Sequence, residues 1–168
     1  EYCMNSQLSV NSIAHSNETT AMTINSSGQI TQSQLIAFHA HTITAQSVNN
    51  YVIFTTEITD TKSCYNVSNG TFTVPAGGDG VYIFHCRLLF DKDSGATPDT
   101  NYNIIQFRKN NSPVSYFISS YYVRGDYDYN IGFHVQAMAA GDTMRIYSGG
   151  NATLYAGNYS HFAGYRIG

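Results

Sequence analysis

The segment RGDYDYN, residues 124–130, concentrates groups that could bind a ligand, in a chain whose charged residues make up only 11% of the total. Carboxylate oxygens are hard ligands of the kind that calcium prefers, and tyrosine combines a flat apolar face with a hydroxyl, which suits a sugar. Alternate residues of an extended segment point to opposite faces, so the two aspartates and Asn130 would share one face and the tyrosines the other. The Arg-Gly-Asp triplet adds integrin binding as a less favoured alternative. The candidate ligands here are Asp126, Asp128, Asn130, Tyr127 and Tyr129.

Catalytic signatures are absent from the sequence. It contains no G-x-S-x-G elbow, no H-E-x-x-H pair and no phosphate-binding glycine loop before a helix, because AGGDG at 76–80 precedes a predicted strand instead. Among the six histidines only His39 and His41 are closely spaced. They would share a face of a strand, where packing at the edge of the core is favoured over a zinc site. The sequence therefore predicts a binding protein and not an enzyme.

Composition narrows the class of protein further. A chain of 168 residues fits one domain that buries roughly two-thirds of its unfolded surface. Eight Lys and Arg residues against eleven Asp and Glu, a net charge of −3, argue against nucleic acid and anionic membranes as partners. No apolar run approaches the roughly 20 residues needed to cross a bilayer. The chain opens at Glu1 without a signal-peptide core, so we expect a mature, processed product.

Two features favour secretion. Six glycosylation sequons occur, and Asn110 begins a seventh; the six begin at Asn17, Asn25, Asn66, Asn69, Asn151 and Asn158. The three cysteines are an odd number, which in an oxidising compartment predicts either one intrachain disulfide with a leftover thiol or an intermolecular bridge. Cys3, in a polar N-terminal stretch, is the candidate for an intermolecular bridge.

The elements that must position the candidate ligands are strands. From residue 35 onward, short runs rich in β-branched and aromatic residues alternate with turn residues, whereas 1–34 are polar and predicted to be an irregular segment packed on or beside the domain. This spacing predicts an all-β sandwich or barrel over 35–168. The predicted strands are 35–41, 51–58, 70–75, 80–90, 101–108, 115–123, 129–138, 142–148 and 161–167.

Alternation along two of these strands predicts which side chains are buried. In the strand at 80–90 every second residue is apolar, and the other set is mixed, with His85 and Arg87. In the strand at 129–138 the apolar set predicts a core face, with His134 and Gln136 pointing away. A mixed outer face of this kind predicts cover by another subunit. The predicted core residues are Tyr82, Phe84, Cys86, Leu88, Phe90, Ile131, Phe133, Val135 and Ala137.

The segment GTFTVPAGGDGVYIFHCRLLF at 70–90 resembles the central signature of C1q/TNF-like domains, an aromatic strand followed by proline, a glycine turn and Gly-x-Tyr-x-Phe. LIAFHA at 35–40, Tyr65, AAGDTMRIY at 139–147 and HFAGYRI at 161–167 follow in the family's order. The resemblance implies a two-sheet jelly-roll sandwich that oligomerises, usually as a trimer. A homodimer linked through Cys3 is the alternative, because a collagen-like stalk is absent and polar residues occupy strands that would line the trimer axis.

In such a jelly roll the connections at 91–101, 124–130 and 148–161 emerge at one end, here called the loop pole. Five of the eleven acidic residues then gather there, and their mutual repulsion favours a bound cation. Calcium, with its six to eight oxygen ligands, suits this set. The acidic residues are Asp91, Asp93, Asp99, Asp126 and Asp128, of which we expect Asp91, Asp93, Asp126 and Asp128 to ligate the metal.

The same pole collects aromatic side chains that suit a sugar ring. Stalkless invertebrate members of the family are often secreted lectins, and the chain is similar in size and composition to small galactose-specific lectins of marine invertebrates. We therefore predict a secreted, calcium-dependent lectin for glycans with terminal galactose. The alternatives are a receptor ligand or innate-immunity recognition protein without sugar binding, and a matrix protein. The expected ligand-binding residues are Asn130, Tyr127, Tyr129, Asp99, Tyr155, Tyr159 and His161.

Overall fold

The computed structural model describes residues 10–14, 20–32, 34–47, 49–91, 102–120, 127–150 and 152–168. The chain divides into two compact units, Glu1–Leu35 and Ile36–Gly168.

The first unit contains an antiparallel three-stranded sheet, where an irregular segment was predicted. Its strands are β1 (Ser12–Ala14), β2 (Thr20–Ile24) and β3 (Ile30–Gln32), in the order β1-β2-β3. In the β2–β3 turn the Asn25 side-chain oxygen accepts hydrogen bonds from the backbone N–H groups of Ser27 and Gln29, and Gly28 has a φ of 77°. An asparagine that bonds to the backbone two residues on, with a glycine at positive φ, makes a tight turn of this kind favourable. The prediction of an irregular segment was wrong for these residues.

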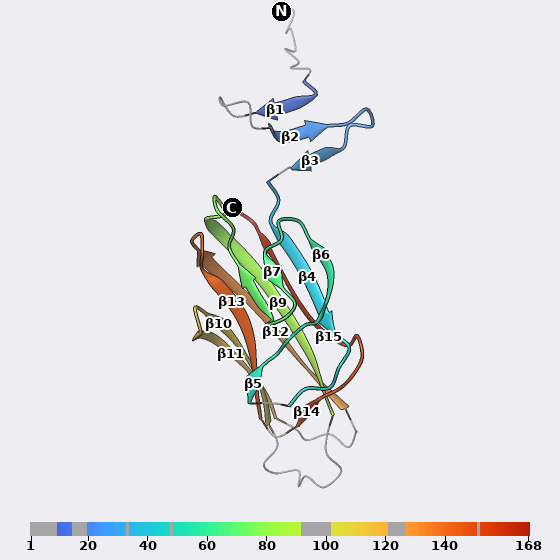
Figure 1. Ribbon diagram of the computed structural model, residues 1–168, viewed down its shortest axis with the longest axis vertical. Helices are drawn as coiled ribbons and strands as arrows, with labels where there is room; N and C mark the ends of the chain where they lie inside the picture. Colours follow the sequence, from blue (N-terminus) through green and yellow to red (C-terminus); the bar gives the residue numbers. More distant parts are fainter. Residues whose placement is uncertain are drawn as a thin grey trace, which may run out of the picture. The chain divides into compact units, whose positions relative to one another are not determined.

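The second unit is a sandwich of two antiparallel sheets (Figure 1). We name them after their central strands, the β9 sheet and the β13 sheet. The β9 sheet has the order β12-β9-β15-β4-β6, and β14 pairs with β9 at one end. Its strands are β4 (Ala37–Thr42), β6 (Thr56–Asp60), β9 (Gly80–Asp91), β12 (Tyr127–Met138), β14 (Thr153–Leu154) and β15 (Ser160–Arg166).

The β13 sheet has the order β11-β10-β13-β8-β7, with β5 paired to β13. This arrangement confirms the predicted all-β jelly-roll sandwich. The single run predicted at 51–58 is divided, since β5 ends at Tyr51 and β6 begins only at Thr56. The strands are β5 (Asn50–Tyr51), β7 (Tyr65–Asn66), β8 (Thr71–Thr73), β10 (Tyr102–Lys109), β11 (Ser112–Ser120) and β13 (Thr143–Gly150).

An aromatic core fills the space between the sheets. The ring of Phe38 stacks on that of Phe72, with centroids 4.9 Å apart, and the Phe107 ring contacts that of Phe162 edge-on. Aromatic pairs at this spacing add about 0.5–1.5 kcal/mol to the free energy of burial. All five predicted core residues of β9 are buried, which confirms the prediction for that strand. They are Tyr82, Phe84, Cys86, Leu88 and Phe90.

The prediction for β12 was wrong by one residue. Ile131, Phe133, Val135 and Ala137 are exposed, and the alternate residues face the interior. The reason lies at Gly132, where an added Cβ would come within 2.7 Å of the Phe107 ring and 2.9 Å of the Phe117 ring. Rings from the β13 sheet therefore occupy the space that apolar β12 side chains would have filled.

His134 and Gln136, predicted to point outward, belong to this inward set. The His134 ring lies 5.7 Å from the Phe107 ring, and its Nε2 is hydrogen-bonded to the side chain of Gln136 at 3.1 Å. Both side chains are half-buried. Their polar groups are hydrogen-bonded to each other, as partly buried polar groups usually are, and the His134 ring packs on Phe107.

Within the described ranges no helix is long and apolar enough to cross a membrane.

Candidate functional site

The strand ends that carry the candidate ligands lie at one end of the sandwich, as predicted. Asp91 at the end of β9 pairs with both Tyr127 and Thr153. The two sheets are joined at the same end, because the Asn130 side chain donates a hydrogen bond to the backbone carbonyl of Asn103. This end is the loop pole. Asp93, Asp99 and Asp126 lie outside the described residues.

The pairing register separates the two described aspartates of the predicted calcium site. Asp91 is paired with Tyr127, whereas Asp128 is paired with Phe90, whose side chain is in the core. Successive residues of a strand point to opposite faces, so Asp91 lies on the outer face of the β9 sheet and Asp128 on the inner face. These two carboxylates do not converge. Among the described residues no three His, Cys, Asp or Glu side chains are placed to hold a metal ion.

Asn130, predicted as a ligand, is buried and points into the sandwich. Its amide nitrogen donates to the backbone carbonyls of Asn103, at 3.2 Å, and Phe117, at 3.1 Å. Two hydrogen bonds of this kind hold the strands together at the loop pole. In this structure Asn130 links β12 to β10 and β11 at the loop pole, and its amide is not available to a ligand at the surface.

Beside Asn130 the core ends in polar side chains that sequence reasoning did not identify. The Asn103 amide and the Ser148 hydroxyl are fully buried and have no hydrogen-bond partner. Leaving such groups unpaired costs about 1–3 kcal/mol each, so sites of this kind normally hold water or a ligand. We call these three residues the polar floor of the loop pole.

Three tyrosines form a cluster on the outer side of the pole. The Tyr127 and Tyr155 rings meet edge-on with centroids 4.7 Å apart, and the Tyr155 and Tyr159 rings are 5.9 Å apart. Tyr127 and Tyr159 are exposed. The Arg87 guanidinium lies 5.1 Å from the Tyr129 ring centroid and donates a hydrogen bond to the Tyr159 carbonyl. The structure thus brings together the four tyrosines predicted to bind ligand.

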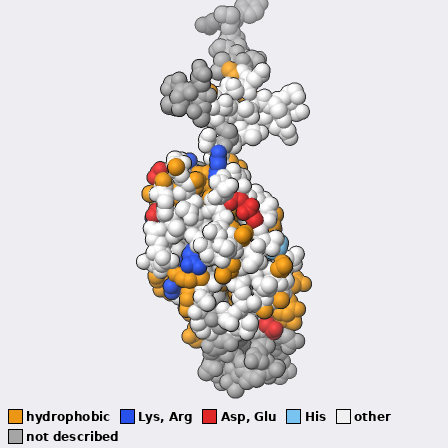
Figure 2. Space-filling view, viewed as in Figure 1, with side chains coloured by type: hydrophobic (Ala, Val, Ile, Leu, Met, Phe, Trp, Pro, Cys, Tyr) orange, Lys and Arg blue, Asp and Glu red, His pale blue; other side chains and the backbone are white. Residues whose placement is uncertain are grey.

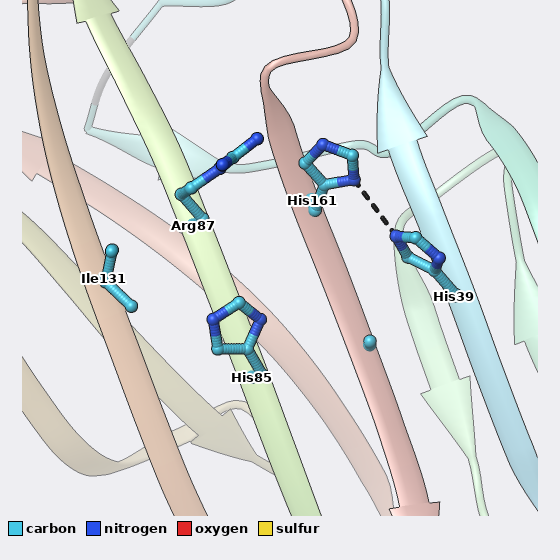
Figure 3. A pocket seen from close by; sticks show the side chains of 6 residues that line it. His39, His85, Arg87, Ile131 and His161 are labelled. Atoms are coloured by element: carbon cyan, nitrogen blue, oxygen red, sulfur yellow. Dashed lines mark hydrogen bonds between the residues drawn. The ribbon is translucent and has the colours of Figure 1, made fainter.

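His161, predicted to lie at the loop pole, belongs instead to a hollow in the outer face of the β9 sheet (Figure 3). Its Nδ1 lies 3.0 Å from the Nε2 of His39, at hydrogen-bonding distance, and its ring is 5.9 Å from that of His41. The hollow is lined by His39, His85, Arg87, Ile131, His161 and Ala163. Its histidines come from three strands far apart in the sequence, so only the His39/His41 spacing could have hinted at it.

The imidazoles in the hollow favour the neutral form. Partial burial lowers the pKa of His39, His85 and His161, because the charged imidazolium loses hydration. The guanidinium of Arg87 lowers the pKa of His85 and His161 further, as a nearby like charge does.

The two described cysteines are free thiols. Cys64 donates a hydrogen bond to the Asp60 carboxylate at 3.2 Å, and burial raises the pKa of both Cys64 and Cys86. These two cysteines are therefore not joined to each other by a disulfide in this structure. Cys3 lies outside the described residues.

Apolar side chains occupy much of the outer face of the β9 sheet. Ile131, Phe133 and Val135 on β12 are each at least half exposed, and Val81 and Tyr165 extend the apolar surface across β9 and β15. The side of the molecule drawn in Figure 2, which is not this face, likewise shows few and scattered charged side chains. Contiguous exposed apolar surface of this kind marks interaction sites in soluble proteins.

The family is shown by sequence. A model of the C1q domain matches residues 37–167, which cover the whole sandwich. The chain belongs to the C1q domain family. A search of curated proteins gives no match.

Solved structures show the same fold. The globular domain of zebrafish complement 1qA protein is 15% identical, with a TM-score of 0.56, over 80% of this chain and 97% of that one. Murine APRIL is 14% identical, with a TM-score of 0.58 over 80% and 100%. Eiger TNF from S. frugiperda is 13% identical, with a TM-score of 0.59 over 80% and 93%. The matched family, the C1q domain, is not a catalytic family.

Proposed function

We propose that this C1q-domain protein is a secreted lectin that binds terminal galactose with the help of calcium and gains avidity by self-association. The observation that carries the proposal is the tyrosine cluster of Tyr127, Tyr155 and Tyr159. Rigid aromatic faces with hydroxyl groups suit the apolar face of galactose and its surrounding hydroxyls.

Asp91 is the described carboxylate best placed for this site. It lies on the same face as Tyr127, beside β14, and the chain that follows it carries Asp93 and Asp99. Calcium held by this acidic segment would screen the repulsion between carboxylates and offer open positions to sugar hydroxyls. Asp128 lies on the inner face of the same sheet and so is not part of this set of ligands.

Self-association supplies the second part of the proposal. The exposed apolar strip of Ile131, Phe133 and Val135 is a surface that a second copy of the chain would cover. A bridge through Cys3 is the covalent alternative, since burial removes Cys64 and Cys86 as partners. Secretion is supported by the sequons, because Asn25, Asn66, Asn69 and Asn158 are all exposed.

Calorimetric titration with galactose and with mannose, in calcium and then in chelator, tests the sugar site. We expect wild type to bind galactose near the millimolar level, about −4 kcal/mol, and only with calcium. Asp91→Asn should weaken calcium-dependent binding because Asp91 shares the tyrosine face, whereas Asp128→Asn, on the opposite face of the sheet, should leave it unchanged.

Tyr127→Ala should abolish galactose binding, whereas Tyr116→Ala is the matched control, a similarly exposed tyrosine on the other sheet. Galactose binding that persists unchanged in Tyr127→Ala and in chelator would refute the site. Saturable binding to a protein receptor, insensitive to sugars, would favour the receptor-ligand alternative.

A further inference from the structure

The hollow in the outer face brings imidazoles of β4, β9 and β15 together. Residues paired across the sheet form rows on its outer face. One row contains Ile131, Arg87, His161 and His41, and the next contains His85 and His39. As Figure 3 shows, the His39 and His161 rings point toward each other from neighbouring strands. Four of the six histidines of the chain thus lie within two rows of one face.

The hydrogen bond between His39 and His161 constrains their protonation. At 3.0 Å one ring nitrogen must carry the proton and the other must offer its lone pair. When both rings are cationic, two N–H groups face each other and the bond is lost. The pair is therefore stable only while at least one imidazole is neutral.

No carboxylate among the described residues compensates a positive charge in this cluster. From β12 the neighbours are Ile131 and Phe133, and from β6 they are Thr56 and Thr59. The other charged or titratable groups near the cluster are His41, His85 and Arg87, none of which can supply a negative charge.

Asp91 lies on the same face four residues along β9 from Arg87 and does not contribute to the pKa shifts of the three histidines. The two acidic residues of β6 are engaged elsewhere. Asp60 accepts hydrogen bonds from the backbone N–H groups of Cys64 and Tyr65. Glu57 is paired with Ala40, whose side chain is in the core, and so lies on the opposite face from the histidines.

We propose that acid switches off self-association through the outer face of the β9 sheet, because the histidine cluster must be neutral to be buried against a second copy. The inference rests on the self-association proposed above. Closing the face would remove water from His39, His85 and His161 while leaving them next to Arg87, so each proton they bind opposes association.

The direction of the pH dependence follows from the extra burial that association imposes. Burial already lowers the pKa of these imidazoles in the unassociated chain, and burial against a second copy would lower it further, so association is favoured above the pKa of the unassociated chain and weakens as the pH falls through it. By linkage, the dissociation constant rises about tenfold per pH unit for each proton that the associated state excludes. Association should therefore be complete at pH 8 and weaken below pH 6.5, as the pH falls through the lowered pKa values of the unassociated chain.

Sedimentation velocity between pH 8 and 5 tests this, with chelator present and in the Cys3→Ser background so that neither metal nor disulfide holds the copies together. We expect the dissociation constant to rise at least tenfold from pH 7.5 to 5.5. The triple variant His39→Gln/His85→Gln/His161→Gln should stay associated at pH 5.5. His134→Gln is the matched control, since that imidazole faces the interior and bonds to Gln136, and it should dissociate in acid like wild type.

The outcomes separate the two proposals. Association that is equally tight at pH 8 and 5.5 overturns the acid switch and leaves self-association standing, whereas a monomer at every pH overturns both. Should the triple variant fail to fold, NMR titration of the histidine rings gives a second measure. The pKa values of His39, His85 and His161 should be higher in a monomeric Phe133→Ser/Val135→Ser variant, which adds no charge to the face, than in the associated protein, and equal values would overturn the switch.

Discussion

Phe84 and Phe133 lie on neighbouring strands one residue out of register, and they show how one step along a strand changes the role of a side chain. His85 is paired with Phe133, so Phe84 faces the core and Phe133 the outer surface. Phe84 is fully buried and contacts the Phe72 ring edge-on, with centroids 5.5 Å apart. Phe133 is 54% exposed. The same residue type therefore stabilises the fold at one position and is available to a partner at the other.

Alanine substitution separates these two roles. Phe84→Ala should cost about 3–5 kcal/mol of unfolding free energy, because it opens a cavity among packed rings. Phe133→Ala should cost about 1 kcal/mol or less in a monomeric background, since more than half of the residue is already exposed within the chain. Urea unfolding of both variants in the Ile131→Arg background measures this. Equal midpoints for the two would contradict the assigned faces.

At the scale of elements, the sequence predicted where strands occur better than which way they face. Runs of β-formers bounded by turn residues located β4, β8, β9, β10, β11, β12, β13 and β15, because strand propensity and turn chemistry are local. The sequence could not show which side of β12 is buried. Alternation divides the strand into two sets of side chains, and which set faces the core depends on Phe107 and Phe117 of the other sheet. The same limit applies to Asp91 and Asp128, whose opposite faces depend on register.

Gly132 is the point at which β12 accommodates the opposite sheet, and its substitution tests that explanation. Gly132→Ala should destabilise the fold by about 1–3 kcal/mol, because its Cβ would overlap the Phe107 and Phe117 rings. Combining it with Phe117→Leu should cost less than the sum of the two single changes, because the smaller side chain makes room. Thermal unfolding of the four proteins of this cycle gives the coupling. Strictly additive effects would mean that ring overlap is not the cause.

At the scale of the whole molecule, a lectin with one weak site per chain depends on how many chains are joined. A site with millimolar affinity gives useful binding to a cell surface only when two or more sites engage together, which can raise the apparent affinity by about 10²–10⁴-fold. Two independent connections are proposed here, the outer face of the β9 sheet and a bridge through Cys3. Cys3 lies far from the tyrosine cluster in the sequence, and Ile131 is four residues along β12 from Tyr127, so we expect that valence and sugar affinity can be varied separately.

Agglutination of galactose-coated beads measures valence directly. Ile131→Arg places a charge in the centre of the apolar outer face, and Cys3→Ser removes the candidate bridge. The double variant should run as a monomer on non-reducing electrophoresis and in sedimentation, and should not agglutinate the beads, while its calorimetric affinity for galactose equals that of wild type. Ile131→Arg alone should remain multivalent to the extent that the Cys3 bridge joins chains, and Cys3→Ser alone to the extent that the outer face does. A monomeric double variant that agglutinates as wild type does would place two sugar sites on one chain, and avidity would then require no assembly at all.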